Sequence, residues 1–192
     1  MPRRKLPQRR YPRPRNRIQA AKAQAMKQLR QAHRHMEKAE FDSAAAIFET
    51  LARKARDRGM LRQAPRLYLQ AGKAHILAEH QDRGQNALQQ GLDILAETER
   101  WPALDTAGHR VIGELKSWGY DEIAETFKAW LKETLPDDED VYQRPARALR
   151  RPALPLKCPS CGGPLRPDEV EWLDHVTAAC PYCGGSVRAE RA

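Results

Sequence analysis

The chain has 192 residues, of which 34 are basic and 25 are acidic, giving a formal net charge of +9. Its longest unbroken apolar run, Ala44 to Phe48, is too short to cross a bilayer, and the first seventeen residues lack the apolar stretch of a secretory signal. This composition excludes a membrane-spanning helix, disfavours an exported disulfide scaffold and predicts a cytoplasmic protein.

The excess positive charge lies in residues 1–17, which we predict to be a disordered tail. This segment has eight basic and no acidic side chains, interleaved with prolines and with few apolar groups that a core could bury. Guanidinium groups pair well with phosphate, so the tail is a candidate contact for RNA, ribosome, DNA or another polyanion. The alternative is a solubilising tail without a specific partner. Its basic residues are Arg3, Arg4, Lys5, Arg9, Arg10, Arg13, Arg15 and Arg17.

Residues 18–135 carry apolar side chains at helical spacing, which predicts a helical domain. The first helix occupies the start of this range, and Asp42 is expected to cap the second. A third helix is expected over 63–80. Asp82 and Gln85 form a plausible capping box for a fourth.

Two further helices follow, and the pattern repeats along the chain. Trp101 precedes the fifth helix, and Pro136 ends the sixth. Phe41 recurs as Tyr120 at an offset of 79 residues, while the middle of the domain matches best at an offset of 44. The six helices are therefore predicted to form three antiparallel hairpins of about 40 residues each, a period typical of helical-repeat arrays.

The helical domain resembles the tetratricopeptide-repeat (TPR) superfamily. An aromatic residue opens the second helix of a pair, followed by a small or aliphatic residue and another aromatic. The domain departs from the family in its period, which should be 34 residues, and in lacking the Trp-Leu-Gly-Tyr pattern. The resemblance implies a curved stack whose groove holds a peptide or helix of a partner protein; a plain helical bundle is the alternative. The matching residues are Phe41, Ala44 and Phe48, then Tyr120, Ile123 and Phe127.

Residues 136–156 are predicted to be an extended linker that contains three prolines. Its basic side chains, with neighbouring Lys157, are a second candidate polyanion contact. The acidic run Asp137–Asp140 is instead a candidate for neutralising a basic tail of the same chain. The candidate contact residues in the linker are Arg144, Arg147, Arg150 and Arg151.

All four cysteines lie in residues 157–192, as two Cys-x-x-Cys pairs separated by eighteen residues: Cys158, Cys161, Cys180 and Cys183. Paired motifs at this separation predict one structural zinc ion, because each pair can direct two sulfurs at the same ion. The segment resembles a zinc ribbon, with strands expected over 170–173 and 176–179. His175 is interpreted as a turn residue. An iron centre is the minority alternative for the metal.

No sequence motif indicates catalysis, and four thiolates would leave a tetrahedral ion no open position. We therefore predict a mainly α protein with a small C-terminal β zinc ribbon, acting as a non-enzymatic adaptor without a small-molecule substrate. The alternatives are a nucleic-acid-binding protein whose basic arms are the primary binding element, and a thiol redox protein that binds no metal.

Overall fold

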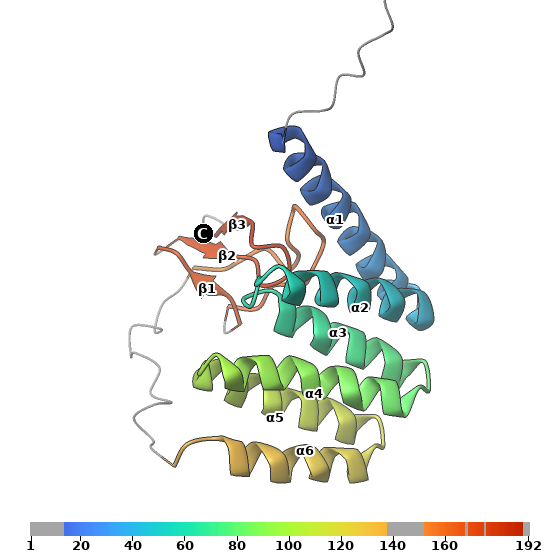
Figure 1. Ribbon diagram of the computed structural model, residues 1–192. Coiled ribbons are helices and arrows are strands. Elements are labelled where there is room, and N and C mark those ends of the chain that lie inside the picture. The colour runs from blue at the N-terminus through green and yellow to red at the C-terminus, as the bar shows by residue number, and fades with distance from the viewer. Residues whose placement is uncertain (1–13, 138–151, 168, 175, 190–192) are drawn as a thin grey trace, which may run out of the picture.

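The computed structural model describes residues 14–137 and 152–189, apart from residues 168 and 175. Within these ranges six helices come first, and a small antiparallel sheet follows. The helices stack in chain order, and the sheet lies beside the α1–α3 end of the stack (Figure 1). The helices are α1 (Pro14–Glu37), α2 (Phe41–Asp57), α3 (Ala64–Leu77), α4 (Gln81–Glu97), α5 (Trp101–Ser117) and α6 (Asp121–Thr134).

The helices pack in consecutive pairs, which confirms the predicted mainly α class. Each helix contacts the next one along the chain, so the domain is a linear stack. No helix in the part of the chain that the structure describes is both long and apolar enough to span a membrane.

The turns between the helices recur at intervals of twenty residues. One residue in each turn has a positive φ of 52–83°. The next residue donates its N–H to the carbonyl five positions earlier, at 2.8–2.9 Å, which satisfies the end of the preceding helix. Two turns therefore span 40 residues, so the repeat offsets are 40 and 80 rather than the 44 and 79 obtained from the sequence. The positive-φ residues are Ala39, Gly59, Glu79, Glu99 and Gly119.

The predicted side-chain caps of α2 and α4 are wrong. The N-cap residues are Glu40 and His80, and neither forms a side-chain cap hydrogen bond. Each of these residues directly follows the positive-φ residue of its turn, so the next helix begins before Asp42 or Asp82 is reached. Both aspartates lie in a first helical turn, and Asp42 Oδ1 instead accepts a hydrogen bond from His80 Nε2 at 2.9 Å.

Small residues recur where paired helices approach most closely. Ala44, Gly84 and Ala124 are 40 residues apart, and both alanines are fully buried. A Cβ at Gly84 would lie 2.6 Å from side-chain carbons of Ile76, so this approach requires a residue without a side chain. Larger apolar side chains form the hydrophobic core of the second half of the stack. The main ones are Ile76, Leu88, Leu92, Leu95, Leu104, Val111, Leu115, Phe127 and Leu131.

The C-terminal module contains the short strands β1 (Glu171–Trp172), β2 (Thr177–Ala179) and β3 (Ser186–Arg188). They form one antiparallel sheet in the order β1-β2-β3. The first two strands lie inside the ranges that the sequence predicted. The third was not predicted, because a single buried apolar residue, Val187, gives no alternating pattern to recognise.

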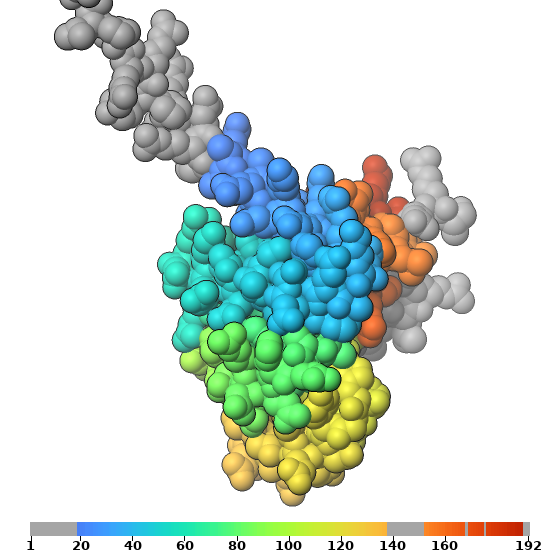
Figure 2. Space-filling view, turned by 90° about the vertical axis from the view of Figure 1, so that its right-hand side faces the viewer, coloured from blue at the N-terminus to red at the C-terminus, as the bar shows by residue number. Residues whose placement is uncertain are grey.

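The module and helices α1–α3 share one hydrophobic core. That core includes Leu154, which is 8% exposed and lies inside the range predicted to be a linker. In Figure 2 the module (orange and red) lies against α1 (blue). At the other end of the chain α1 begins at Pro14, so Arg15 and Arg17 lie in its first turn rather than in an extended tail.

Candidate metal centre

The two cysteine pairs lie on turns that have the same backbone geometry. In the first, Gly162 donates its N–H to the Cys158 carbonyl at 2.8 Å. In the second, Gly184 donates to the Cys180 carbonyl at the same distance. Both glycines have a positive φ, 76° and 68°, which residues with a Cβ adopt only at a cost. The paired glycines that follow each Cys-x-x-Cys motif therefore make these turns possible.

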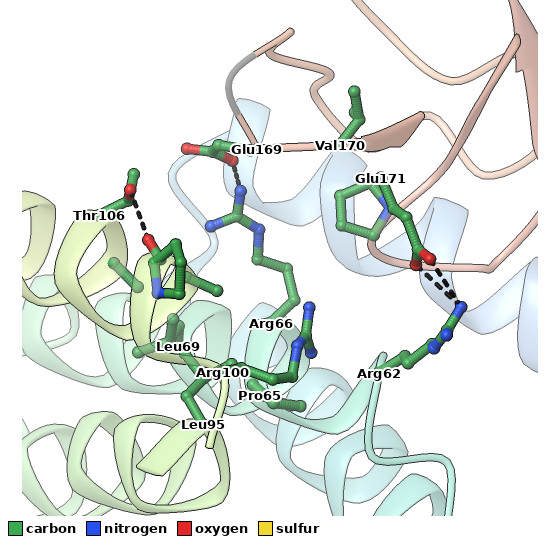
Figure 3. A pocket seen from close by; sticks show the side chains of 14 residues that line it. Arg62, Pro65, Arg66, Leu69, Leu95, Arg100, Thr106, Glu169, Val170 and Glu171 are labelled. Atoms are coloured by element: carbon green, nitrogen blue, oxygen red, sulfur yellow. Dashed lines mark hydrogen bonds and ion pairs between the residues drawn. The ribbon is translucent and has the colours of Figure 1, made fainter. Parts of the chain in front are cut away.

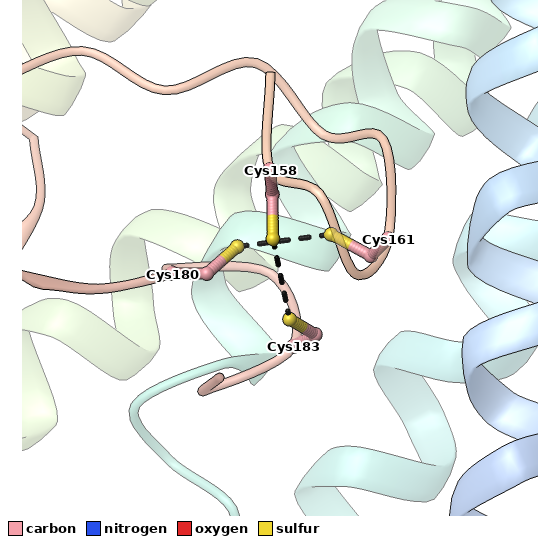
Figure 4. A group of neighbouring side chains, drawn as sticks. All are labelled: Cys158, Cys161, Cys180 and Cys183. Carbon is pink, nitrogen blue, oxygen red and sulfur yellow. Dashed lines mark hydrogen bonds between the residues drawn. The ribbon is translucent and has the colours of Figure 1, made fainter. Parts of the chain in front are cut away.

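The turns bring all four sulfur atoms to within 4.8 Å of one another (Figure 4). The Sγ atoms of Cys158 and Cys183 are 3.9 Å apart, and those of Cys161 and Cys180 are 3.7 Å apart. An ideal tetrahedron with metal–sulfur bonds of about 2.3 Å has sulfur–sulfur edges of about 3.8 Å. The cluster therefore has the size that one tetrahedral metal ion requires.

Backbone N–H groups that point at the sulfurs, together with the burial of the cysteines, make the cluster suitable for a metal cation. The N–H groups of Gly163 and Gly185 point at Cys161 Sγ and Cys183 Sγ, each at 3.4 Å. Three of the sulfur-bearing residues are at most 2% exposed, and only Cys183 is half-buried. Hydrogen bonding among the sulfurs and burial raise the pKa of Cys161, so metal binding there has to displace a proton.

Tyr182, between the cysteines of the second pair, anchors the module to the helices. Its ring makes an edge contact with His33, with 5.1 Å between ring centroids, and lies 5.9 Å from the Arg66 guanidinium. Its hydroxyl oxygen accepts a hydrogen bond from Gln70 at 3.2 Å. The same turn that supplies two sulfurs therefore also supplies the main aromatic contact with α1 and α3.

His33 is buried beneath this contact. It is 7% exposed and also makes an edge contact with Phe48, at 5.2 Å between centroids. Burial lowers the pKa of His33 to about 4, although Glu37 opposes the shift. Lys157 and Cys183 also act on it, in opposite directions. The imidazole is therefore neutral at physiological pH and packs as part of the core.

Hydrogen bonds and ion pairs of charged side chains also link the module to helices further along the stack. Arg30 of α1 donates to the Ser160 carbonyl at 2.5 Å. Arg62, just before α3, forms a two-pronged ion pair with Glu171 at 2.9–3.0 Å. Further ion pairs join Glu37 to Lys157, and both Arg66 and Arg110 to Glu169. These contacts all come from α1, α3, α5 or the turn before α3, the first helices of the three pairs.

The structure brings together the four predicted metal ligands, Cys158, Cys161, Cys180 and Cys183. Lys157, a predicted polyanion contact, forms an exposed ion pair with Glu37. The candidate residues in 1–13, those in 138–151 and His175 lie outside the described residues. Sequence reasoning missed Glu169 and Tyr182; only the position of Tyr182, as the one large apolar residue between paired cysteines, offered a signal.

No protein-family model, curated protein or solved structure matches this chain. The fold and the cluster therefore define its class by themselves. It is a helical protein of stacked pairs with a C-terminal four-cysteine cluster suited to one metal ion.

Proposed function

We propose that the cluster binds one structural zinc ion and that the protein is a non-enzymatic adaptor. The observation that carries the metal assignment is the gathering of four sulfurs within 4.8 Å of one another, with separations of 3.7 and 3.9 Å for two pairs, close to the edge of a tetrathiolate tetrahedron. Zinc dominates such all-sulfur tetrahedral sites. Four thiolates fill its coordination sphere, so the ion supplies folding free energy rather than an open position for substrate.

Elemental analysis of the purified chain tests the zinc assignment. We expect about one zinc per chain, and Cys161→Ser should abolish binding because it removes a buried ligand. Ser186→Ala, an exposed change on β3, is the matched control and should retain the metal. Iron at a similar stoichiometry would support the rubredoxin-type alternative. Metal-free chain with two catalytically active thiol pairs would support the redox alternative.

Chelation tests the structural role of the ion. Removing it should free the module from the helices, because without the ion no bond links the sulfurs of one turn to those of the other. The far-ultraviolet circular dichroism reports on the helices, and the helical domain also contains Trp101, Trp118 and Trp130. A change in the near-ultraviolet signal at a constant far-ultraviolet signal therefore reports on Tyr182 and Trp172 of the module. An unchanged aromatic signal after complete chelation would contradict the structural role.

The proposed adaptor role includes a TPR-like arrangement and a protein partner. The exact 20-residue spacing of the turns supports a repeat array. The inner contacts of α1, α3 and α5 are taken by the chain's own module, so the partner needs another surface. A groove of 820 Å³ offers one, between α1, α2 and the second cysteine turn. Its floor includes Met26, Leu29, Leu51 and Leu67.

The charges around this groove indicate the kind of segment that fits. The lining includes Lys22, Lys54 and Arg58 and no acidic residue. An apolar surface that contains methionine can pack against varied apolar side chains of a partner, because methionine is flexible. Basic residues around it favour a partner with acidic side chains. An amphipathic acidic segment of a partner protein is therefore the expected occupant. Lys54→Glu together with Arg58→Glu should abolish its capture without changing zinc content.

The basic segments are proposed to attach the adaptor to RNA, ribosome or another polyanion. The alternative function, a nucleic-acid-binding protein, has specific support in the charge of residues 1–17. Deleting residues 1–13 leaves α1 intact and removes six basic side chains. If these charges drive binding to a duplex, the log–log salt slope should fall by up to about 5.

Affinity purification of the full chain and of this deletion, each with and without nuclease, separates the two functions. Protein partners retained after both treatments support the adaptor. If all retained partners are lost on nuclease treatment or on deletion, the nucleic-acid-binding alternative is correct.

A further inference from the structure

A second site lies where the module meets α3 and the start of α5. A pocket of 440 Å³ opens there, a volume in the range of about 300–1,000 Å³ that small-ligand sites occupy (Figure 3). Its floor is apolar and buried, formed by side chains of the helices, and Val170 and Pro181 of the module close one side. The floor residues are Pro65, Leu69, Leu95 and Ala107.

The charges that line the pocket do not balance. Its lining contains three arginines and two glutamates. Arg62 pairs with Glu171 at the exposed rim, and Arg66 pairs with Glu169 in the buried part. The third guanidinium, that of Arg100, forms no hydrogen bond or ion pair with any residue that the structure describes. Glu169 is also shared with Arg110, so the lined space has more positive than negative charge.

Arg100 is placed to pair with an anion. It is half-buried, and Figure 3 shows its side chain extending into the space between Arg66 and Arg62. Burial lowers the pKa of Arg100, and Glu171 only partly offsets this effect. A guanidinium that has lost part of its water without a hydrogen-bonded counter-ion is costly. An anion in the pocket would therefore find a donor that is already partly desolvated.

We propose that this pocket binds a single carboxylate carried on a compact apolar group. The carboxylate would pair with the Arg100 guanidinium, and the apolar group would lie on the floor formed by Leu69, Leu95 and Ala107. One guanidinium without a paired carboxylate matches one carboxylate, which it can hold through two parallel hydrogen bonds. The C-terminus of a peptide and a free organic acid share this chemistry. The inference goes beyond the proposed adaptor function and requires only the folded, metal-loaded chain.

Matched acids and amides test the site on the zinc-loaded full chain by calorimetry. The probes are 4-methylpentanoate and its amide, and acetyl-Gly-Gly-Leu with a free or an amidated C-terminus. We expect each acid that binds to do so about tenfold or more tightly than its amide, since a charge-assisted bond is lost with the amide. Binding of both acids identifies a site for free organic acids. Binding of the peptide alone identifies a site for protein C-termini.

Arg100→Gln should bring the affinity of the acid down to that of the amide. Arg83→Gln, an exposed change on α4 outside the pocket, is the matched control and should leave it unchanged. Zinc content and the far-ultraviolet spectrum show whether each variant remains folded, and Arg100→Lys offers a second test because it keeps the charge without the planar fork. Equal affinities for acid and amide, no binding of either acid at millimolar concentration, or an unchanged affinity in a folded Arg100→Gln variant would each overturn the proposal.

Discussion

Replacing Tyr182 with alanine tests how much the packing of the module against the helices contributes to stability. The side chain is 4% exposed and contacts His33, Arg66 and Gln70, but it donates no sulfur to the cluster. Tyr182→Ala therefore removes these contacts between the module and the helices and leaves all four cysteine ligands in place. If the shared core holds the protein together, unfolding of the helices as well as of the module should become easier.

The expected magnitude follows from the burial. Truncating a fully packed aromatic ring to alanine costs about 3–5 kcal/mol. Tyr182→Phe loses only the hydrogen bond from Gln70, worth about 0.5–1.5 kcal/mol. With a urea dependence of about 2 kcal/mol per molar, the unfolding midpoint should fall by about 1.5–2.5 M for alanine and by less than about 0.7 M for phenylalanine.

The assay is urea unfolding of the zinc-loaded chain, followed by the circular dichroism of the helices. Leu173→Ala, an exposed change in the same module, is the control and should shift the free energy of unfolding by less than about 0.5 kcal/mol. Zinc content is measured for each variant. A Tyr182→Ala protein that retains its zinc and unfolds at the same urea concentration as Leu173→Ala would refute the shared core.

Two further predictions concern backbone conformation and pH. Gly162→Ala should destabilise the module by about 1–2 kcal/mol because the residue has a positive φ, although no atom lies within 4 Å of the added Cβ. Gly113→Ala adds a methyl group to equally open space within α5 and should be neutral or stabilising, so equal thermal shifts for the two variants would contradict this reasoning. The pKa of His33 is lower in the fold than its ordinary value of 6.5, so its contribution is complete above that pH and is lost as the pH falls towards 4. At about pH 5.5 the wild type should have lost about 1 kcal/mol that a folded His33→Gln variant does not lose, measured by urea unfolding at each pH with zinc retained.

Local patterns in the sequence predicted the helices and the four-cysteine cluster. The spacing of apolar residues places α1–α6 because a helix repeats every 3.6 residues, and two-residue spacing alone lets each cysteine pair share an ion. The caps were mispredicted because the geometry of the preceding turn, which Asp42 and Asp82 do not reveal, decides where the next helix begins.

The docking of the module could not be predicted in the same way. Glu169 meets Arg66 across more than one hundred residues of chain, and Tyr182 meets His33 across a longer separation still. No spacing rule links residues so far apart, and each of them is unremarkable in its own neighbourhood. The unpaired Arg100 was missed for the same reason, since its lack of a counter-ion depends on how the glutamates of the module are already paired.

The shared core has a consequence for how the protein is made. The residues that cover α1–α3 are near the C-terminus, so they leave the ribosome after the helices have been synthesised. During that interval the inner faces of α1 and α3 are not packed against the module. The module can dock only after its second cysteine pair has been synthesised and has bound the ion. With zinc as the proposed ion, the cellular zinc supply would then set how long newly translated chains expose this surface to chaperones and proteases.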